Sequence, residues 1–145
     1  MDRSGDWGLL IGRIAMIALF LVSAAGKFGS LNETAALLAT KSFPLALPLT
    51  IFVATIELMG AICIALGFYS RPVAIGLIVY TIAATVTFHD FWVLEGAARQ
   101  GQFIHFMKNV GLAGAFAIIA SVGPGRFSLD AIMRKPVQQS AGAVA

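Results

Sequence analysis

The sequence predicts an all-α membrane protein, a four transmembrane helix bundle with a short interfacial helix between spans 1 and 2. Hydrophobic residues make up 59% of its 145 residues, charged residues only 12%, and its mean hydropathy is +0.88. A soluble domain of this length cannot bury so much apolar surface. Four apolar runs approach or reach the length a helix needs to cross the hydrocarbon core. Because lipid offers no hydrogen-bond partners to open sheet edges, we expect residues 1–145 to form a single integral membrane domain.

Each expected span is an apolar run with at most a few polar interruptions. The four ranges are residues 8–26, 45–67, 72–88 and about 103–122. Arg13 alone interrupts the first run with a charge, and Glu57 alone interrupts the second. The third run is short but uncharged, and the fourth has Lys108 and Asn109 near its start. We expect the first run to stay as a span and not to be cleaved as a signal peptide, because Arg13 interrupts it and acidic residues precede it.

Two further elements are expected outside the spans. Ser30 and Glu33 have the spacing of a capping box, in which both side chains bond free amides at the start of a helix. We therefore expect a helix over about residues 31–41, which lies along the outer interface or covers the mouth of the bundle. After the last span, residues 128–135 are expected to form a short surface helix and residues 137–145 a flexible tail.

The distribution of lysine and arginine predicts the orientation. Slightly more of these residues flank the two termini and the turn between spans two and three than flank the opposite side. This bias predicts a multi-pass protein of the cell (inner) membrane with both termini in the cytoplasm. The net charge of +3 suits anionic lipid headgroups. Nucleic acid is not an expected partner, because the basic residues are dispersed and have no aromatic residues among them.

Charged residues at membrane depth are the strongest functional signal in the sequence. Glu57 lies midway along its span, where a charged side chain costs about 2.5–3.5 kcal/mol on insertion scales, so it is expected to meet a cation. From axial depths we expect that cation to be Arg13 or Lys108, and the sequence does not distinguish the two. An ion pair that only fixes helix packing would explain the same pattern. The expected intramembrane polar cluster comprises Arg13, Lys27, Glu57, Lys108 and Asn109.

A candidate mouth for a ligand or partner is expected at the outer end of the bundle. The first and third spans end there and the fourth begins there. A quinone headgroup could accept hydrogen bonds from Lys27, Lys108 or Asn109 at this end, with its tail among the apolar helices. A structural polar plug is the alternative interpretation. The residues expected at this mouth are Phe20, His89, Asp90, Trp92, His105 and Phe106.

Several short segments follow one another along the chain, and they include Gly12-Arg13, Gly26-Lys27, Glu57 with Gly60, His89-Asp90-Phe91-Trp92 and His105-Phe106-Met107-Lys108-Asn109. In this order they resemble the DoxX family of small four-helix bacterial and archaeal membrane proteins. The resemblance covers about residues 8 to 130. It implies association with membrane oxidoreductase systems, including quinone-linked thiosulfate oxidation, and it implies no agreed catalytic residue.

The expected function is that of an accessory or quinone-interacting subunit of a membrane-associated oxidoreductase. A redox partner protein or a homo-oligomer is the expected assembly. No catalytic residue, metal or firmly bound cofactor is assigned, and quinone is the candidate ligand. The sequence contains no nucleophile elbow, phosphate-binding loop or dinucleotide fingerprint, so an enzyme acting alone is not expected.

The sequence also bears on four alternative functions. A small proton-coupled transporter that uses Glu57 is the principal one. His89 and His105 could together hold a haem, or bind a metal with Asp90, but no close ligand motif fixes either site. Disulfide exchange is disfavoured because Cys63 is the only cysteine.

Overall fold

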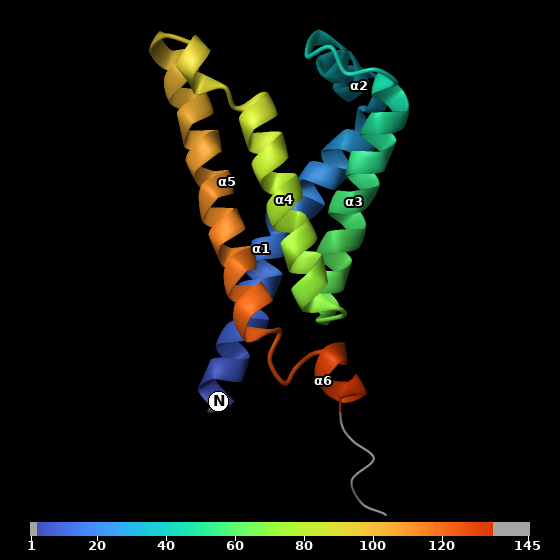
Figure 1. Cartoon of the computed structure of the whole chain (residues 1–145), viewed down its shortest axis with the longest axis vertical. Helices are drawn as coiled ribbons and strands as arrows, with labels where there is room; N and C mark the ends of the chain where they lie inside the picture. The colour runs from blue at the N-terminus through green and yellow to red at the C-terminus, as the bar shows by residue number, and fades with distance from the viewer. Residues whose placement is uncertain (1–2, 135–145) are drawn as a thin grey trace, which may run out of the picture.

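The computed structural model describes residues 3–134, and every regular element in that range is helical. The elements are, in order, α1 (Arg3–Gly29), α2 (Leu31–Thr40), α3 (Ala46–Leu66), α4 (Ser70–Phe88), the short 3-10 helix η1 (Phe91–Val93), α5 (Gly96–Val122) and α6 (Leu129–Met133) (Figure 1). Four of these, α1, α3, α4 and α5, are long and apolar enough to cross a membrane. The predicted all-α, four-helix membrane fold is thereby confirmed. The expected tail at residues 137–145 lies outside the described residues.

The spanning helices differ from the expected ranges mainly at their ends. α1 begins at Arg3 and α5 begins at Gly96, each well before the first residue of its apolar run. Hydropathy locates the part of a helix that lies in lipid, whereas the backbone hydrogen bonds of a helix continue through polar residues. The first turns of α1 and α5 therefore extend beyond the apolar stretch.

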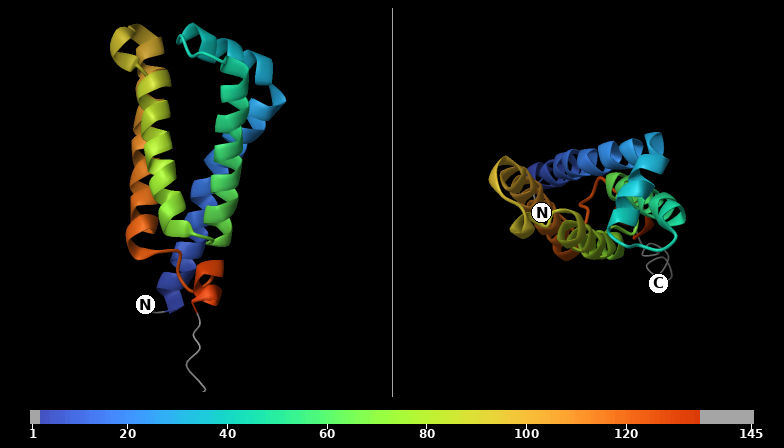
Figure 2. Two further views of the ribbon diagram at one scale, coloured as in Figure 1. Left: turned by 45° about the vertical axis from the view of Figure 1, so that its right-hand side comes forward. Right: turned by 90° about the horizontal axis from the view of Figure 1, so that it is seen from above.

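The four spanning helices pack as two pairs. α1 lies against α3, and α4 lies against α5, whereas α3 and α4 contact each other less extensively. The pairs meet where α6 and the start of α1 lie and diverge toward α2 (Figures 1 and 2). We call the end with α6, the start of α1 and the α3–α4 turn the closed end. We call the end with α2 and the α4–α5 connection the open end.

Apolar side chains fill the space between the pairs on the side of the closed end. Phe20 of α1 packs edge-on against Phe116 of α5, with ring centroids 5.4 Å apart. α3 and α4 approach closely at Gly60, where an added Cβ would lie 2.7 Å from Leu77 Cδ2. The missing side chain at Gly60 leaves room for the Leu77 side chain to pack directly on the backbone of α3.

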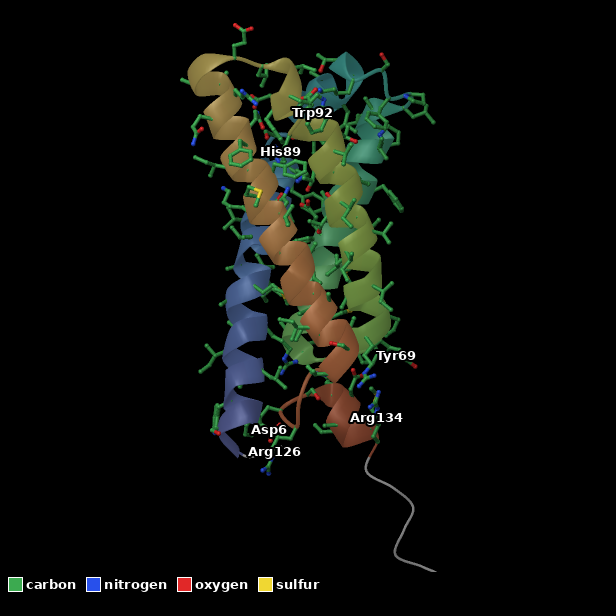
Figure 3. The ribbon with its side chains drawn as sticks, turned by 60° about the vertical axis from the view of Figure 1, so that its left-hand side comes forward. Asp6, Tyr69, His89, Trp92, Arg126 and Arg134 are labelled. Carbon is green, nitrogen blue, oxygen red and sulfur yellow. The ribbon has the colours of Figure 1, made fainter. Side chains whose placement is uncertain are left out.

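Polar groups join the helix ends at the closed end. Asp130 accepts hydrogen bonds from the backbone amides of Tyr69 at 2.8 Å and Ser70 at 2.9 Å, which satisfies free amides at the start of α4. Asp6 accepts a hydrogen bond from the backbone amide of Arg126 at 3.1 Å. Figure 3 shows Asp6 and Arg126 side by side at this end, far from His89 and Trp92 at the open end.

Arg13 is fully buried at the closed end and does not pair with Glu57. Its Nη1 donates to the carbonyl oxygen of Ile64 at 3.1 Å, and its Nη2 donates to that of Phe127 at 2.6 Å. The last carbonyls of a helix have no partner within the helix, and the guanidinium supplies donors to them. The expectation of Arg13 as a candidate partner of Glu57 is therefore wrong.

The capping box expected at the start of α2 is also absent. Ser30 makes no side-chain cap to α2, and its hydroxyl instead donates to the carbonyl of Gly26 at 2.9 Å. The Ser30 backbone amide donates to the same carbonyl at 3.0 Å, so α2 follows α1 almost without interruption. A helix that continues from another in this way leaves little for a cap to satisfy. The bounds of α2 nevertheless agree closely with those expected, and α2 packs on α3 at the open end.

Candidate functional site

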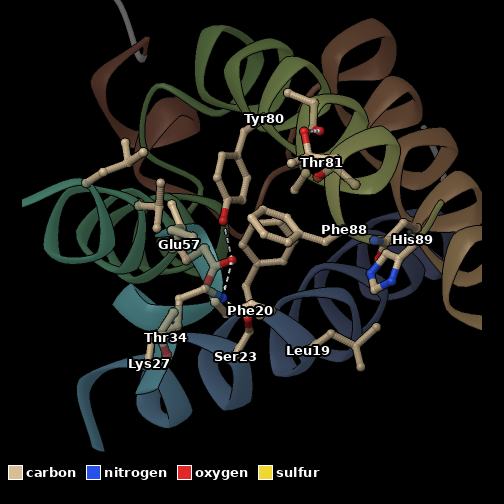
Figure 4. Close-up of a pocket in the computed structure, with 18 of the residues that line it drawn as sticks. Leu19, Phe20, Ser23, Lys27, Thr34, Glu57, Tyr80, Thr81, Phe88 and His89 are labelled. Carbon is tan, nitrogen blue, oxygen red and sulfur yellow. Dashed lines mark hydrogen bonds and ion pairs between the residues drawn. The ribbon is translucent and has the colours of Figure 1, made fainter. Parts of the chain in front are cut away.

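A cavity of about 470 Å³ lies between the two helix pairs, toward the open end. All four spanning helices contribute to it, and Thr34, Leu37 and Leu38 of α2 line it as well. Its wall is mainly apolar, with a few polar side chains that face inward (Figure 4). Apolar residues that line it include Leu19, Phe20, Val53, Phe88 and Leu112.

The most polar part of the cavity wall is a hydrogen-bonded group of three residues from three helices. Lys27 Nζ of α1 lies 2.9 Å from Oε2 and 3.0 Å from Oε1 of Glu57 on α3. Tyr80 of α4 donates its hydroxyl to Glu57 Oε1 at 2.5 Å. We call Lys27, Glu57 and Tyr80 the polar triad, and its bonds are the dashed lines of Figure 4. It connects the α1–α3 pair to α4 across the space between the pairs.

Burial strengthens the electrostatic attraction within the polar triad. Glu57 is only 5% exposed, and an ion pair in such surroundings is screened far less than one in water. Lys27 also donates to Ser23 Oγ at 2.6 Å, one turn earlier on α1. The ammonium group thus has three acceptors around it, the two carboxylate oxygens and the serine hydroxyl.

The cation that meets Glu57 is Lys27, and the expected pairing with Arg13 or Lys108 is wrong. Arg13 is held at the closed end, and Lys108 is exposed on α5 and does not line the cavity. Lys27 reaches Glu57 because a lysine stem is long and flexible, so its ammonium can lie well away from its own Cα. Of the predicted polar cluster, Lys27, Glu57 and Asn109 line one cavity, and Arg13 and Lys108 lie elsewhere.

Sequence reasoning did not single out Tyr80. A weak signal was present, because Tyr80 is the only tyrosine within the four expected spans. A buried tyrosine usually finds a hydrogen-bond partner for its hydroxyl. The Phe20 ring lies edge-on to the Tyr80 ring, with centroids 6.1 Å apart, and helps to hold it in place.

The residues expected at the mouth divide into those that line the cavity and those beside it. Phe20 and His89 line it. The His89 ring stacks on that of His105, with centroids 5.3 Å apart, and its Nδ1 is 2.7 Å from Gln102 Oε1. The remaining predicted mouth residues, which lie outside the lining, are Asp90, Trp92, His105 and Phe106.

Two contacts bridge the helix pairs at the open end. Lys41, just after α2, forms an ion pair with Asp90, just after α4, at 2.7 Å between Nζ and Oδ2. The rings of Phe43 and Phe88 stack with centroids 6.5 Å apart.

Among residues 3–134, no three histidine, cysteine, aspartate or glutamate side chains are grouped so that they could hold a metal ion.

A second, shallow apolar groove adjoins the cavity. Phe43 and Leu49 line both the cavity and this groove. The rest of the groove wall is apolar and lies around the start of α3. Its other residues are Pro44, Leu45, Pro48 and Phe52.

Comparison with known proteins finds similar membrane proteins. The sequence model of the DoxX family matches residues 8–90, a range that contains the whole polar triad. Inner membrane protein YphA of Escherichia coli strain K12 is 38% identical over 122 residues, which are 84% of this chain and 87% of that protein. Inner membrane protein YqjF of the same strain is 31% identical over 136 residues, 93% of this chain and 98% of that protein.

A more distant similarity extends to yeast. ER-derived vesicles protein ERV29 of Saccharomyces cerevisiae is 21% identical over 129 residues, and these cover 89% of this chain but only 34% of that protein. No solved structure matches the chain at a significant level.

Proposed function

The chain belongs to the DoxX family, and on that premise we propose that it is an inner-membrane protein whose cavity binds a quinone headgroup. In this proposal it acts as an accessory subunit of a membrane-associated oxidoreductase. The observation that carries the proposal is the position of the polar triad on the wall of an otherwise mainly apolar cavity within the membrane-spanning helices.

The chemistry of the polar triad suits both redox forms of such a ligand. A quinone is a flat apolar ring whose carbonyl oxygens accept hydrogen bonds. In this proposal a quinone oxygen replaces an existing acceptor, either Ser23 Oγ for Lys27 or Glu57 Oε1 for Tyr80. The reduced quinol carries hydroxyl groups, and the Glu57 carboxylate can accept a hydrogen bond from one of them. The triad therefore offers donors to the oxidised ligand and an acceptor to the reduced ligand.

The dimensions and walls of the cavity suit a ring with an apolar tail. Ligand sites commonly have volumes of about 300–1,000 Å³, with apolar walls and a few convergent polar groups. The volume of about 470 Å³ lies in that range. In this proposal the tail passes Phe43 and Leu49, which line both the cavity and the apolar groove, and leaves toward the bilayer along that groove.

The accessory role comes from the resemblance to the DoxX family, which implies association with oxidoreductase systems. A redox partner protein would complete the assembly and exchange electrons with the bound quinone, and a homo-oligomer is the alternative assembly. We also propose that the closed end faces the cytoplasm, as the lysine and arginine bias predicts. The cavity then opens toward the opposite side of the membrane.

A proton-coupled transporter is the second candidate function. The observation that favours it is a glutamate at membrane depth on the wall of a cavity that lies toward one end of the bundle. The existing bonds of Glu57 to Lys27 and Tyr80 weigh against it, because a transported cation would have to displace Lys27. Cation-dependent proton exchange in liposomes that Glu57→Gln abolishes would replace the quinone proposal with transport.

The experiment that tests the quinone proposal is solvent extraction of the purified protein, with quinones measured by mass spectrometry and partner proteins by pull-down. We expect the quinone content per folded protein to be reduced in Lys27→Met and in Tyr80→Phe. Tyr80→Phe removes one hydroxyl and keeps both charges of the ion pair. A fall in its quinone content is therefore not explained by misfolding around an unpaired charge. Lys108→Met is the matched control, because Lys108 is an exposed lysine outside the cavity.

Two results would count against the proposal. Quinone that is equally abundant in wild type, Lys27→Met and Tyr80→Phe would place the molecule in the surrounding lipid. A stable redox partner recovered without any retained quinone would keep the accessory role and remove quinone binding.

A further inference from the structure

Thr81 of α4 differs from the other threonines of the spanning helices. Thr50, Thr55, Thr85 and Thr87 each donate the side-chain hydroxyl to the carbonyl four residues earlier, at distances of 2.9, 2.8, 2.6 and 2.8 Å. This bond to the preceding turn is a common way for a helical threonine to satisfy its hydroxyl. Thr81 Oγ1 makes no hydrogen bond to any described residue, although Thr81 is only 4% exposed.

An unpaired hydroxyl at this position requires a reason. A buried polar group without a partner lowers stability, and the bond that would satisfy it is available to other threonines of the same helix. Thr81 lines the cavity that contains the polar triad, directly after Tyr80 in the sequence (Figure 4). Thr81 is therefore a residue of the cavity wall with a buried, unsatisfied hydroxyl, which a rotation about χ1 would present to a ligand.

We propose that Thr81 contacts the ligand, with its hydroxyl bonded to a second oxygen of a lipid-soluble molecule whose first oxygen lies at the polar triad. This inference rests on the proposed function and narrows its ligand to molecules with two hydrogen-bonding oxygens. A hydroxyl both donates and accepts, so Thr81 serves a carbonyl oxygen of a quinone and a hydroxyl of a quinol equally well. A fatty alcohol, with a single oxygen, would leave either Thr81 or the triad without its partner.

The test is equilibrium binding of decylubiquinone to the purified full-length protein in detergent. Thr81→Val removes the hydroxyl at nearly constant volume, and Thr81→Ser keeps it. Thr85→Val is the matched control, since Thr85 lies one turn further on the same helix, is 3% exposed, does not line the cavity, and bonds its hydroxyl to its own helix. We expect the Kd to rise about three- to tenfold in Thr81→Val, as loss of one neutral hydrogen bond implies, and to be close to wild type in the other two.

Thermal stability without ligand gives a second readout. Thr81→Val removes an unsatisfied polar group, so the ligand-free variant should melt at or above the temperature of the wild type. Added decylubiquinone should then stabilise Thr81→Val less than wild type. A residue that only maintains packing would not combine unchanged or raised stability with weaker binding.

The outcomes separate this inference from the proposed function. If wild type and Thr81→Val bind decylubiquinone equally, the Thr81 contact is overturned and the quinone site stands. If wild type does not bind decylubiquinone, the proposed function fails. The lipids that copurify with wild type and with each variant are then compared by mass spectrometry. A copurifying molecule lost only in Thr81→Val would support the contact with another two-oxygen ligand, and identical lipids would overturn it.

Discussion

Lys27 and Glu57 form an ion pair between two transmembrane helices, with Nζ 2.9 Å from Oε2 and side chains 22% and 6% exposed. Either charge alone would be costly at this depth. Together, and with the Tyr80 hydroxyl on the same carboxylate, they form a polar group whose bonds join three helices. The two helix pairs diverge on the open-end side, and the cavity lies between them there.

The first prediction concerns the coupling between these two charges. Glu57→Ala should destabilise the protein by about 3–5 kcal/mol, because it leaves the Lys27 ammonium unpaired in the bundle. Glu57→Ala combined with Lys27→Met should recover much of that loss, whereas Glu57→Ala with Lys108→Met should recover none. Thermal unfolding in detergent measures the stability of the single variant and of the two double variants. Additive effects of the Glu57 and Lys27 changes would show that the pair does not interact.

The second prediction concerns Arg13. Hydrogen bonds from a charged group contribute about 1.5–3 kcal/mol each, and Arg13 makes them to Ile64, Ala65 and Phe127. Arg13→Lys should cost several kcal/mol, because an ammonium lacks the forked donors that reach the end of α3 and the loop before α6 together. Quinone content per folded protein should stay at the wild-type level. Wild-type stability of Arg13→Lys in a thermal melt would refute this role.

Much of the fold was predictable, because the apolar content of a run of residues is enough to identify it as a membrane-spanning helix. The four spans follow from the apolar runs, and helical spacing grouped Lys27, Glu57 and Asn109, which all line one cavity. The bounds of α2 agree with those expected, although the capping box that predicted them is absent. The partner of Glu57 did not follow. Depth along a helix axis depends on tilt, on where the helix begins and on the direction of a long side chain, and apolar content fixes none of these.

The polar residues of α4 were also beyond sequence reasoning. Tyr80 and Thr81 stand in an uncharged run, where hydropathy reads them as ordinary members of a span. Which hydroxyl bonds its own helix and which faces a cavity depends on the neighbouring helices. The orientation of the bundle and the binding of quinone remain predictions.

The third prediction concerns access from the lipid. Phe43 lines both the cavity and the apolar groove, and it stacks on Phe88. Phe43→Ala should open a side path and raise the dissociation rate of decylubiquinone, measured by rapid dilution, by several-fold. Phe52→Ala is the control, because Phe52 lines the groove and not the cavity. Equal rates for Phe43→Ala and wild type would mean that the ligand reaches the cavity by another route.

The fourth prediction concerns orientation. Glu33 on α2 and Arg126 before α6 are both exposed and lie at opposite ends of the bundle. In a Cys63→Ala background, a membrane-impermeant maleimide should label Glu33→Cys in intact cells and Arg126→Cys only after lysis. The reverse pattern would place the open end in the cytoplasm and contradict the lysine and arginine bias.

The central claim is that a quinone headgroup occupies the cavity beside the polar triad, and photoaffinity labelling in native membranes tests it most directly. An azido-quinone should cross-link to cavity-lining segments within residues 19–27, 49–57 and 80–89, and excess decylubiquinone should suppress that labelling. Tyr80→Phe should reduce it without a change in protein level. Labelling spread over lipid-facing residues such as Ile11, Val79 and Ile118, with no competition by decylubiquinone, would contradict the account.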